Sequence, residues 1–181
     1  MNARDSRIWT IGHSTRSREE FLDLLKENRI QTLVDVRTFP GSRRYPHFNR
    51  ENLRSSLADA DINYHHMPEL GGRRKAKPDS LNMAWRNESF RGYADHMETN
   101  TFQEGIERLL ERARAERTTI MCAEAVWWRC HRSLISDFLK AAGVTVTHII
   151  AAGKTEEHPY TSAAQIVNGE LSYRGVLESP E

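Results

Sequence analysis

The stretch TTIMCAEAVWWRCHRSLISDFLKAAGVTVTHII (residues 118–150) decides the fold class of this chain. Residues 118–122 and 144–150 are largely apolar or β-branched, which is typical of buried strands. Between them, apolar residues recur at helical spacing over residues 133–142, and Gly143 stands where a helix-ending glycine belongs. Strand, helix and strand in this order predict two parallel strands joined by a crossover helix.

The same alternation extends toward the N-terminus. Further strands are predicted at residues 8–11, 32–36 and 62–66. Further helices are predicted after the capping residues Ser17 and Asn49, at residues 93–98 and at residues 101–115. This order of elements predicts an α/β fold with a mostly parallel sheet flanked by helices on both faces, although it does not give the order of the strands.

The chain is predicted to form one domain. Its 181 residues, 38% hydrophobic and 28% charged, suit a single well-buried globular unit. We expect an α/β domain over residues 1–181, with a core at about 8–150 and a C-terminal β-hairpin at about 165–174. The hairpin is predicted from Asn168-Gly169, a pair typical of type I′ turns.

The sequence contains no sign of a membrane or export segment. No apolar run approaches the roughly 20 residues needed to cross a bilayer. The N-terminus is polar, and the apolar stretch after it is too short for a secretory signal. We therefore expect a cytoplasmic protein with no membrane partner. Its two cysteines, Cys122 and Cys130, cannot form a disulfide framework, and a reducing compartment would keep them as thiols.

The charge of the chain is unevenly distributed. The net charge is +1, but residues 37–91 hold 11 basic and 6 acidic side chains, whereas residues 92–181 hold 9 basic and 13 acidic. Arginine accounts for 21 of the 26 basic residues, and its flat guanidinium binds carboxylate or phosphate in a bidentate manner. We expect either an anionic partner near the middle of the chain or a solvated arginine-rich surface. The basic segment 68–92, which has Gly and Pro breakers and little periodicity, is predicted to be a long loop.

Chemically reactive side chains follow several of the predicted strands. Ligands of open parallel sheets bind beyond the carboxyl ends of the strands, so these side chains are expected to meet at one edge. They are His13 and Ser14 after the first strand, Asp35 and Arg37 after the second, Arg73 and Arg74 after the third, and Cys122 and Glu124 after the fourth. The sequence therefore predicts a functional site at this edge; the alternative is that polar residues simply prefer loops.

Cys130, His131 and Arg132 are predicted to lie in the first turn of the helix that continues to residue 142. A helix N-terminus has unpaired N–H groups and a partial positive charge, which suit an anion and lower the pKa of a nearby thiol. Cys130 is therefore a candidate nucleophile, and a packing role is the alternative. Cys122, at the end of an apolar strand, is expected to be buried and inert. The spacing of the two cysteines matches no common zinc pattern, so no metal ligands are predicted.

Two carboxylates are candidates for proton transfer. Asp35 and Arg37 alternate along the end of a strand and so point the same way, and Glu124 shares the face of Cys122. Asp35 and Glu124 are thus a candidate acid–base pair. The alternative for Asp35 is an ion pair with Arg37 that merely ties two strands together.

Aromatic and arginine residues are mixed in two predicted loops. Trp127 and Trp128 precede Arg129, and Arg43 and Arg44 precede a tyrosine. Such mixtures suit stacking on nucleobases and contacts with phosphate. The alternative for each tryptophan is that it covers the core from a loop.

Four motifs resemble those of a known family. They are TIGHS (residues 10–14), DVRTFPGSRR (35–44), LGGRR (70–74) and MCAEAVWWRCHR (121–132). As an ordered set they resemble the bacterial family catalogued as domain of unknown function 488. The resemblance implies a compact α/β domain and no established activity or substrate. A weaker likeness to rhodanese and related phosphatase folds would imply an active cysteine, but the long loop between the two cysteines departs from their tight glycine-rich cradle.

These observations lead to three functional hypotheses. The first is an enzyme that acts on a nucleotide or nucleic-acid substrate by glycosidic or phosphoester chemistry. The second is sulfur or phosphoryl transfer at Cys130, and the third is a non-enzymatic module that binds nucleic acid, a metal or another cofactor. The predicted catalytic residues are Asp35, Glu124, His13, Cys130 and His131, and the predicted substrate-binding residues are Ser14, Arg37, Arg43, Arg44, Arg73, Arg74, Trp127, Trp128 and Arg132. Which cofactor is bound and how many copies assemble do not follow from the sequence.

Overall fold

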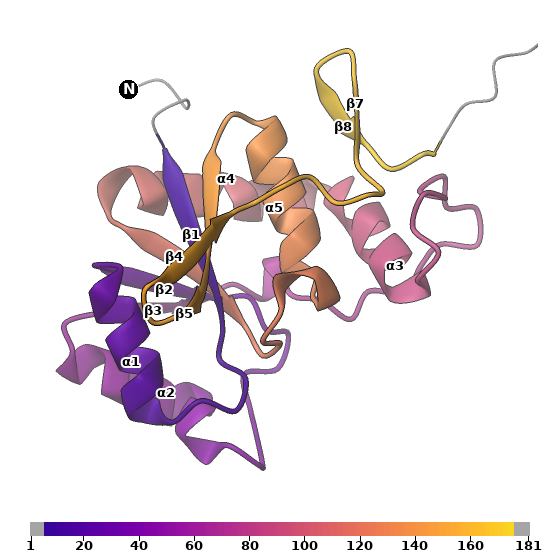
Figure 1. Cartoon of the computed structure of the whole chain (residues 1–181). Helices are drawn as coiled ribbons and strands as arrows, with labels where there is room; N and C mark the ends of the chain where they lie inside the picture. Colours follow the sequence, from indigo (N-terminus) through magenta and orange to yellow (C-terminus); the bar gives the residue numbers. More distant parts are fainter. Residues whose placement is uncertain (1–5, 176–181) are drawn as a thin grey trace, which may run out of the picture.

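The computed structural model describes residues 6–175, and its centre is a six-stranded sheet (Figure 1). Its strands lie in the order β3 (Asn63–His66), β2 (Thr32–Asp35), β4 (Thr118–Cys122), β1 (Arg7–Gly12), β5 (Thr145–Ala151) and β6 (Lys154–Glu157). The first five in this order are parallel, and β6 is antiparallel to β5. The predicted α/β fold with a mostly parallel sheet is therefore confirmed. Most of the predicted polar N-terminus, residues 1–5, lies outside the described residues.

Helices cover both faces of the sheet (Figure 1). The helices α1 (Arg18–Glu27) and α2 (Arg50–Asp59) cover one face, and α3 (Glu88–Met97), α4 (Asn100–Ala115) and α5 (Arg132–Ala141) cover the other. Side chains of β1 alternate between the two cores, because successive residues of a strand point to opposite faces. Ile8 packs on the side of α3 to α5, whereas Trp9 and Ile11 pack on the side of α1 and α2.

Local side-chain caps decide where two helices begin. Ser17 caps α1 by accepting a hydrogen bond from the backbone N–H of Glu20 at 3.1 Å, as predicted. The start of α3 was predicted at residue 93, which is wrong. The side chain of Asn87 caps α3 by accepting from the N–H of Phe90, so the helix begins at Glu88. The predicted loop 68–92 is correspondingly shorter.

The remainder of the basic loop is held by Asp95 of α3. Its carboxylate accepts hydrogen bonds from the Lys77 backbone N–H at 2.9 Å, the Ser80 hydroxyl at 2.6 Å and the Asn82 side-chain amide at 2.8 Å. A buried carboxylate that satisfies several donors orders a loop that has no regular structure of its own. The loop therefore has a defined path from the sheet edge to α3.

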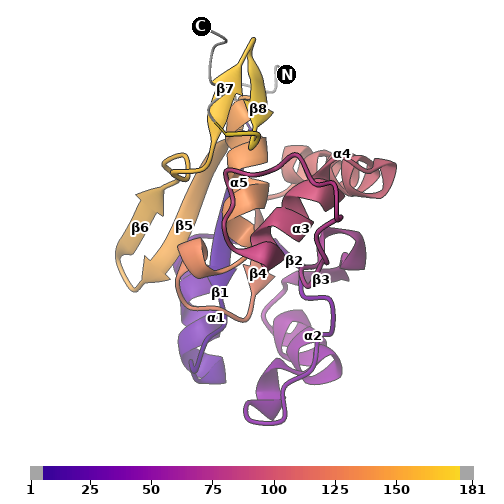
Figure 2. The ribbon, with the colours of Figure 1, turned by 90° about the vertical axis from the view of Figure 1, so that its right-hand side faces the viewer.

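The predicted C-terminal β-hairpin is confirmed. The strands β7 (Gln165–Val167) and β8 (Glu170–Ser172) form a separate antiparallel sheet. Asn168 and Gly169 have φ angles of +52° and +81°, as a type I′ turn requires. The hairpin projects from the body of the molecule at the end away from α2 (Figure 2).

The chain leaves two neighbouring strands toward opposite faces of the sheet. After β1 it turns to α1 on one face, and after β4 it turns to α5 on the other. Where connections diverge in this way, a crevice forms beyond the carboxyl ends of the strands. β1 and β4 lie in register, with Gly12 opposite Cys122. The topology therefore favours a ligand site where these two strands end.

Candidate functional site

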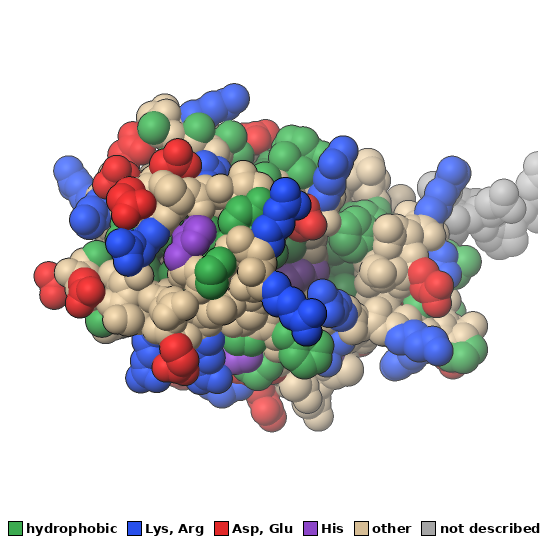
Figure 3. All heavy atoms as spheres, turned by 90° about the horizontal axis from the view of Figure 1, so that it is seen from below, with side chains coloured by type: hydrophobic (Ala, Val, Ile, Leu, Met, Phe, Trp, Pro, Cys, Tyr) green, Lys and Arg blue, Asp and Glu red, His purple; other side chains and the backbone are tan. Residues whose placement is uncertain are grey.

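A pocket of about 300 Å³ lies at the carboxyl edge of the sheet. Small-molecule sites in proteins begin at about this volume. The residues that line it include Arg37, Phe39, Arg73, Tyr93, Cys122, Glu124, Arg129, Cys130 and His131. Figure 3 looks onto this edge of the molecule, where Lys and Arg side chains gather around a hollow. We refer to this cavity as the edge pocket.

The edge pocket brings together five of the residues predicted from the sequence. They are Arg37, Arg73, Glu124, Cys130 and His131. Three further pocket residues, Phe39, Tyr93 and Arg129, were not predicted as site residues from the sequence. Arg129 lies within the motif MCAEAVWWRCHR, so the sequence did contain a signal for it. Tyr93 belongs to α3, and only the folded chain carries that helix to the sheet edge.

Seven of the nine predicted substrate-binding residues are not among those that line the edge pocket: Ser14, Arg43, Arg44, Arg74, Trp127, Trp128 and Arg132. Arg74 donates hydrogen bonds to the carbonyls of Gly71 and Pro68, so its side chain stabilises the start of the basic loop. The Arg44 guanidinium lies over the ring of its neighbour Tyr45, 5.7 Å from the centroid. Adjacency to a motif does not decide where a long side chain points, since rotamers and local partners decide it.

Asp35 and Arg37 form a buried ion pair beneath the edge pocket. Arg37 donates from Nε to Oδ1 of Asp35 at 2.9 Å and from Nη2 to Oδ2 at 2.7 Å, and the Tyr64 hydroxyl donates to Oδ2 at 2.6 Å. Asp35 has no exposed surface, and the side chain of Arg37 is 7% exposed. Burial, together with the adjacent Asp35 carboxylate, raises the pKa of Tyr64, which keeps this hydroxyl a donor. The predicted ion pair is present, but it joins two residues of one segment, so it orients Arg37 and does not tie two strands together.

Arg132 is also buried and does not line the edge pocket. Its guanidinium donates to Thr10 Oγ1 at 3.1 Å and to the Glu124 carbonyl at 2.9 Å. Its backbone N–H lies 3.4 Å from Cys130 Sγ. None of the ion pairs found among residues 6–175 includes Arg132. Its positive charge is therefore held close to Cys130 without a carboxylate to neutralise it.

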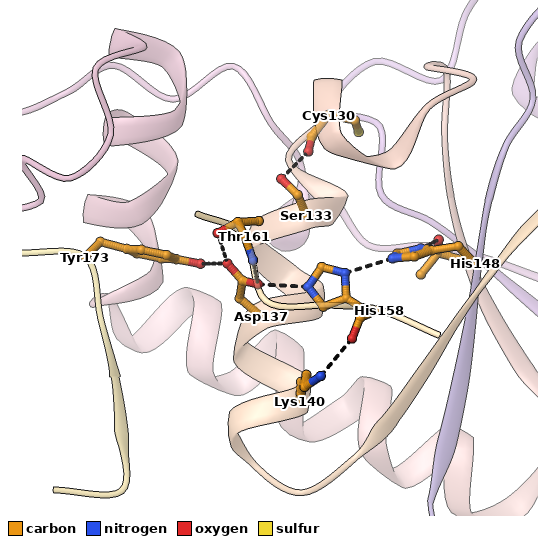
Figure 4. A network of polar contacts seen from close by, with 9 residues as sticks. Cys130, Ser133, Asp137, Lys140, His148, His158, Thr161 and Tyr173 are labelled. Carbon is orange, nitrogen blue, oxygen red and sulfur yellow. Dashed lines mark hydrogen bonds and ion pairs between the residues drawn. The ribbon is translucent and has the colours of Figure 1, made fainter. Parts of the chain in front are cut away.

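A chain of buried hydrogen bonds continues from Thr10 to Asp137 of α5, and Figure 4 shows its part from His148 to Asp137. Thr10 Oγ1 lies 2.6 Å from His148 Nδ1, His148 Nε2 lies 2.8 Å from His158 Nδ1, and His158 Nε2 lies 2.8 Å from Asp137 Oδ1. The carboxylate can only accept, so His158 Nε2 donates to it when both rings are neutral. His148 Nε2 then donates to His158 Nδ1, and the Thr10 hydroxyl donates to His148 Nδ1. This chain holds Thr10, the partner of the Arg132 guanidinium, in place.

Trp127 belongs to this buried network rather than to the pocket. Its ring stacks on His148 with 4.7 Å between centroids and 5° between planes, and only 7% of the residue is exposed. It therefore covers the core, as the alternative interpretation of the tryptophans predicts. Trp128 is 52% exposed and remains available to a ligand.

Two buried histidines make the stability of the fold depend on pH. Burial lowers the pKa of His13 from 6.5 to about 4 and that of His148 from 6.5 to about 2. Both rings are neutral in the folded protein at pH 5, whereas the unfolded chain protonates them below about pH 6.5. The unfolded chain thus binds more protons in this range, so folding stability falls as the pH falls.

We expect the free energy of unfolding to fall by roughly 2 kcal/mol for each of these histidines between pH 7 and pH 5. Urea denaturation at the two pH values measures the change. His148→Gln removes one titrating ring, so the loss of stability of this variant over the interval should be smaller by about 2 kcal/mol. An identical pH dependence in the variant and the parent would contradict a neutral His148 in the fold.

Cys130 lies in the wall of the edge pocket. It was predicted in the first turn of the helix, which is wrong, because α5 begins at Arg132 with His131 as its N-cap and Cys130 is the C-cap of the preceding 3₁₀ turn. Its Sγ is 2.7 Å from Cys122 Sγ, 3.4 Å from His131 Nδ1 and 3.4 Å from the Arg132 N. His131 Nε2 lies 2.9 Å from the carbonyl of Val36 and so carries the ring proton, which leaves Nδ1 of the neutral ring as an acceptor that faces Cys130. Cys130 therefore has a proton acceptor and a helix N-terminal donor within reach.

The basic loop fixes the orientation of the His131 ring. A Cβ atom at Gly72 would lie 2.8 Å from His131 Nδ1, so a side chain here would displace the ring or the loop. On the other side, the ring of Tyr93 packs 5.0 Å from the His131 ring. This close approach explains why a glycine is needed at position 72 of the LGGRR motif.

The two thiols differ in their tendency to ionise. Burial opposes ionisation of Cys130, but the hydrogen bond with Cys122 and the charge of Arg132 outweigh it and lower the pKa of Cys130 below its ordinary value. Burial raises the pKa of Cys122, and contact with Cys130 raises it further. Cys130 is therefore the more readily ionised thiol of the pair.

The residues that the structure describes hold no group of three or more His, Cys, Asp and Glu side chains placed to bind a metal ion. Over the same residues, no helix is long and apolar enough to cross a membrane.

Fold and pocket together define a parallel-sheet α/β protein whose candidate site lies at the carboxyl edge of the sheet, where one of two neighbouring cysteines has a lowered pKa. The chain belongs to the family described as domain of unknown function DUF488, whose model matches residues 17–139. This match includes three of the four motifs that carried the resemblance. No curated protein and no solved structure matches the chain. The weaker likeness to rhodanese and phosphatase folds is not confirmed by these comparisons.

Proposed function

We propose that the protein is an enzyme that binds an anionic substrate in the edge pocket and uses Cys130 as its nucleophile. The observation that carries this proposal is the environment of Cys130 Sγ, whose pKa is lowered at the start of α5 in the wall of a pocket. The thiolate is the reactive form of cysteine, so a low pKa beside a cavity favours covalent group transfer. His131 Nδ1, 3.4 Å away, is the base that would accept the thiol proton.

The geometry favours this chemistry over proton transfer by Asp35. Asp35 is fully buried, and its two oxygens accept bonds from Arg37 and Tyr64. His13 is buried as well and does not line the pocket. Glu124 is exposed and lines the pocket, so it is the carboxylate available for proton transfer to a leaving group.

Three arginines support an anionic substrate, such as a phosphate ester or a sulfur oxyanion. All three line the edge pocket. Arg73 and Arg129 are exposed, whereas Arg37 is buried. The ion pair with Asp35 uses Nε and Nη2 of Arg37, and Nη1 lies 3.5 Å from His13 Nε2, a long contact that an anion oxygen could replace. Guanidinium groups that converge on one cavity raise the local concentration of anions and bind their oxygens through charge-assisted hydrogen bonds.

A nucleotide or nucleic acid is the substrate class favoured by one further observation. Phe39 lines the edge pocket and is 70% exposed, and the Arg73 guanidinium lies 5.8 Å from the centroid of its ring. An exposed aromatic ring beside an arginine is suited to stacking on a base while the arginine binds phosphate. Trp128, on the loop before Cys130, offers a second exposed ring.

We expect iodoacetamide to label Cys130 at pH 6 faster than an ordinary thiol, and we expect inorganic phosphate, thiosulfate or a nucleoside monophosphate to slow the labelling. The double variant Arg73→Ala/Arg129→Ala should need about tenfold more anion for the same protection, because each charge-assisted hydrogen bond contributes about 1.5–3 kcal/mol before screening by solvent. Mass spectrometry of the labelled peptide measures the rate. Arg43→Ala is the matched control, since Arg43 is exposed but does not line the pocket.

Each part of the proposal has its own contrary result. Labelling at the rate of an ordinary thiol would contradict a nucleophilic Cys130. Equal protection of the parent and the double variant would contradict an anion site. Stronger protection by the nucleotide than by phosphate, lost in Phe39→Ala, would support the nucleotide class, whereas equal protection would contradict it.

A further inference from the structure

We propose that Cys122 and Cys130 are a redox pair that a small hydroperoxide, such as hydrogen peroxide, converts to a reversible disulfide within the chain. The proposal shares Cys130 with the proposed function, but it requires no substrate in the edge pocket. It therefore goes beyond that function, and either of the two can fail alone.

The first support is the distance between the two sulfur atoms. Cys122 Sγ and Cys130 Sγ lie 2.7 Å apart, and a disulfide bond is about 2.05 Å long. Bond formation therefore needs the two sulfur atoms to approach by less than about 1 Å. Cys122 ends β4, whereas Cys130 follows a 3₁₀ turn, Trp127–Arg129, outside regular helix or strand. The segment that carries Cys130 is thus the one expected to move when the disulfide bond forms.

The second support is access from solvent to one of the two thiols. Both cysteines line the edge pocket, which opens at the sheet edge. Both are otherwise buried, and no further cysteine is present in the chain to compete as a disulfide partner. Cys130 is 6% exposed and Cys122 is 1% exposed, so a small peroxide that enters the pocket meets Cys130, the more readily ionised thiol, first.

The chemistry takes place in two balanced steps. Cys130 sulfur attacks one peroxide oxygen, so that the thiol is oxidised to a sulfenic acid and the other peroxide oxygen leaves as water. Cys122 sulfur then attacks the sulfur of that sulfenic acid, and the hydroxyl leaves as a second water with the proton of Cys122. Two thiols and one peroxide thus give one disulfide and two waters. His131 Nδ1, 3.4 Å from Cys130 Sγ, is positioned to transfer the proton in both steps.

The consequence for the site is the loss of its nucleophile. The disulfide occupies the sulfur that would attack a substrate. Reduction by a dithiol restores the free Cys130 thiol. Oxidation at this pair would thus switch the site off and protect Cys130 from irreversible oxidation to the sulfinic acid.

The test treats the reduced full-length protein with an equimolar amount of hydrogen peroxide and follows its intact mass and its free thiols. We expect a loss of two hydrogen atoms, the disappearance of both thiols after denaturation, a monomer on a non-reducing gel, and full reversal by dithiothreitol. In Cys122→Ser, Cys130 should instead remain a sulfenic acid that adds dimedone. In Cys130→Ser, Cys122 should keep its thiol under the same treatment.

A gain of oxygen in the parent protein without loss of thiol pairs, a disulfide-linked dimer, or both thiols left intact would each overturn the proposal. These readouts come from the parent protein, so they stand even where a cysteine variant folds poorly. Rapid iodoacetamide labelling of Cys130 without disulfide formation would leave the proposed function intact and remove the redox pair. Disulfide formation in the parent protein, with no protection of Cys130 by anions, would leave the redox pair intact and remove the proposed anion site.

Discussion

Gly12→Ala is expected to destabilise the fold strongly and to disorganise the loop that carries the candidate site. A Cβ atom at this position would lie 1.7 Å from the carbonyl oxygen of Glu124 and 2.6 Å from its carbonyl carbon. Both are backbone atoms, so neither can rotate away as the end of a side chain would. The strand β1 or the segment after β4 must therefore shift, which breaks the register between Gly12 and Cys122.

The loss of stability from Gly12→Ala should be about 3 kcal/mol or more, because overpacking against backbone cannot be relieved by a change of rotamer. For a domain of this size the melting temperature should fall by roughly 6–12 °C. Thermal unfolding followed by circular dichroism measures it. The Glu124 carbonyl also accepts a bond from Arg132, so the environment of Cys130 should change and its labelling at low pH should slow.

Gly41→Ala is the matched control for this variant. A Cβ at Gly41 has no atom within 4 Å, and its φ is not positive. The change should alter stability by less than about 0.5 kcal/mol. Similar melting temperatures for the two variants would contradict the close approach of β1 to the loop after β4.

Asp137→Ala is expected to have the second large effect. Asp137 is fully buried in α5 and accepts hydrogen bonds from the His158 ring at 2.8 Å, from the Thr161 N–H and hydroxyl at 3.0 and 2.6 Å, and from the Tyr173 hydroxyl at 2.7 Å. Figure 4 shows these groups directed at one carboxylate. The variant would leave four donors without their acceptor, and the donors of His158 and Tyr173 are buried, which costs about 3–5 kcal/mol.

The effect of Asp137→Ala should be concentrated at the C-terminal side of the chain, because His158, Thr161 and Tyr173 all lie after β5. Hydrogen exchange should show early loss of protection in residues 158–173, and urea denaturation gives the total change. Ser136→Ala is the matched control, since its hydroxyl is buried in the same helix without a hydrogen-bond partner. It should be neutral or slightly stabilising. Equal losses in the two variants would contradict the anchoring role of Asp137.

The secondary structure shows which elements the sequence could predict and which it could not. The repeating patterns of single segments predicted β1, β2, β3, β4, β5, α1, α5 and the C-terminal hairpin. β6 was not predicted, because its four residues KTEE are all exposed and have no apolar side to mark a strand. The start of α3 was missed because its cap, Asn87, stands in a polar segment where nothing distinguishes a cap from a loop residue.

The candidate site was predicted as a region and not as a set of contacts. Parallel strands bring their carboxyl ends to one edge, so Arg37, Arg73, Glu124, Cys130 and His131 could be expected together. Arg132 and Trp127 could not be interpreted correctly from their place in the motif. Arg132 is held by Thr10 of β1, and Trp127 stacks on His148 of β5, so partners far away in the chain turn both side chains inward.

By itself, the sequence determined the kind of element at most positions, since backbone conformation follows from neighbouring residues and from the spacing of apolar side chains. It also determined which edge of the sheet collects reactive groups. Only the tertiary structure decided the order of the strands, the contact between Cys122 and Cys130, and the burial of Asp35, Arg132 and Asp137. Burial, hydrogen-bond partners and thiol pKa depend on contacts between distant segments, which no local pattern contains.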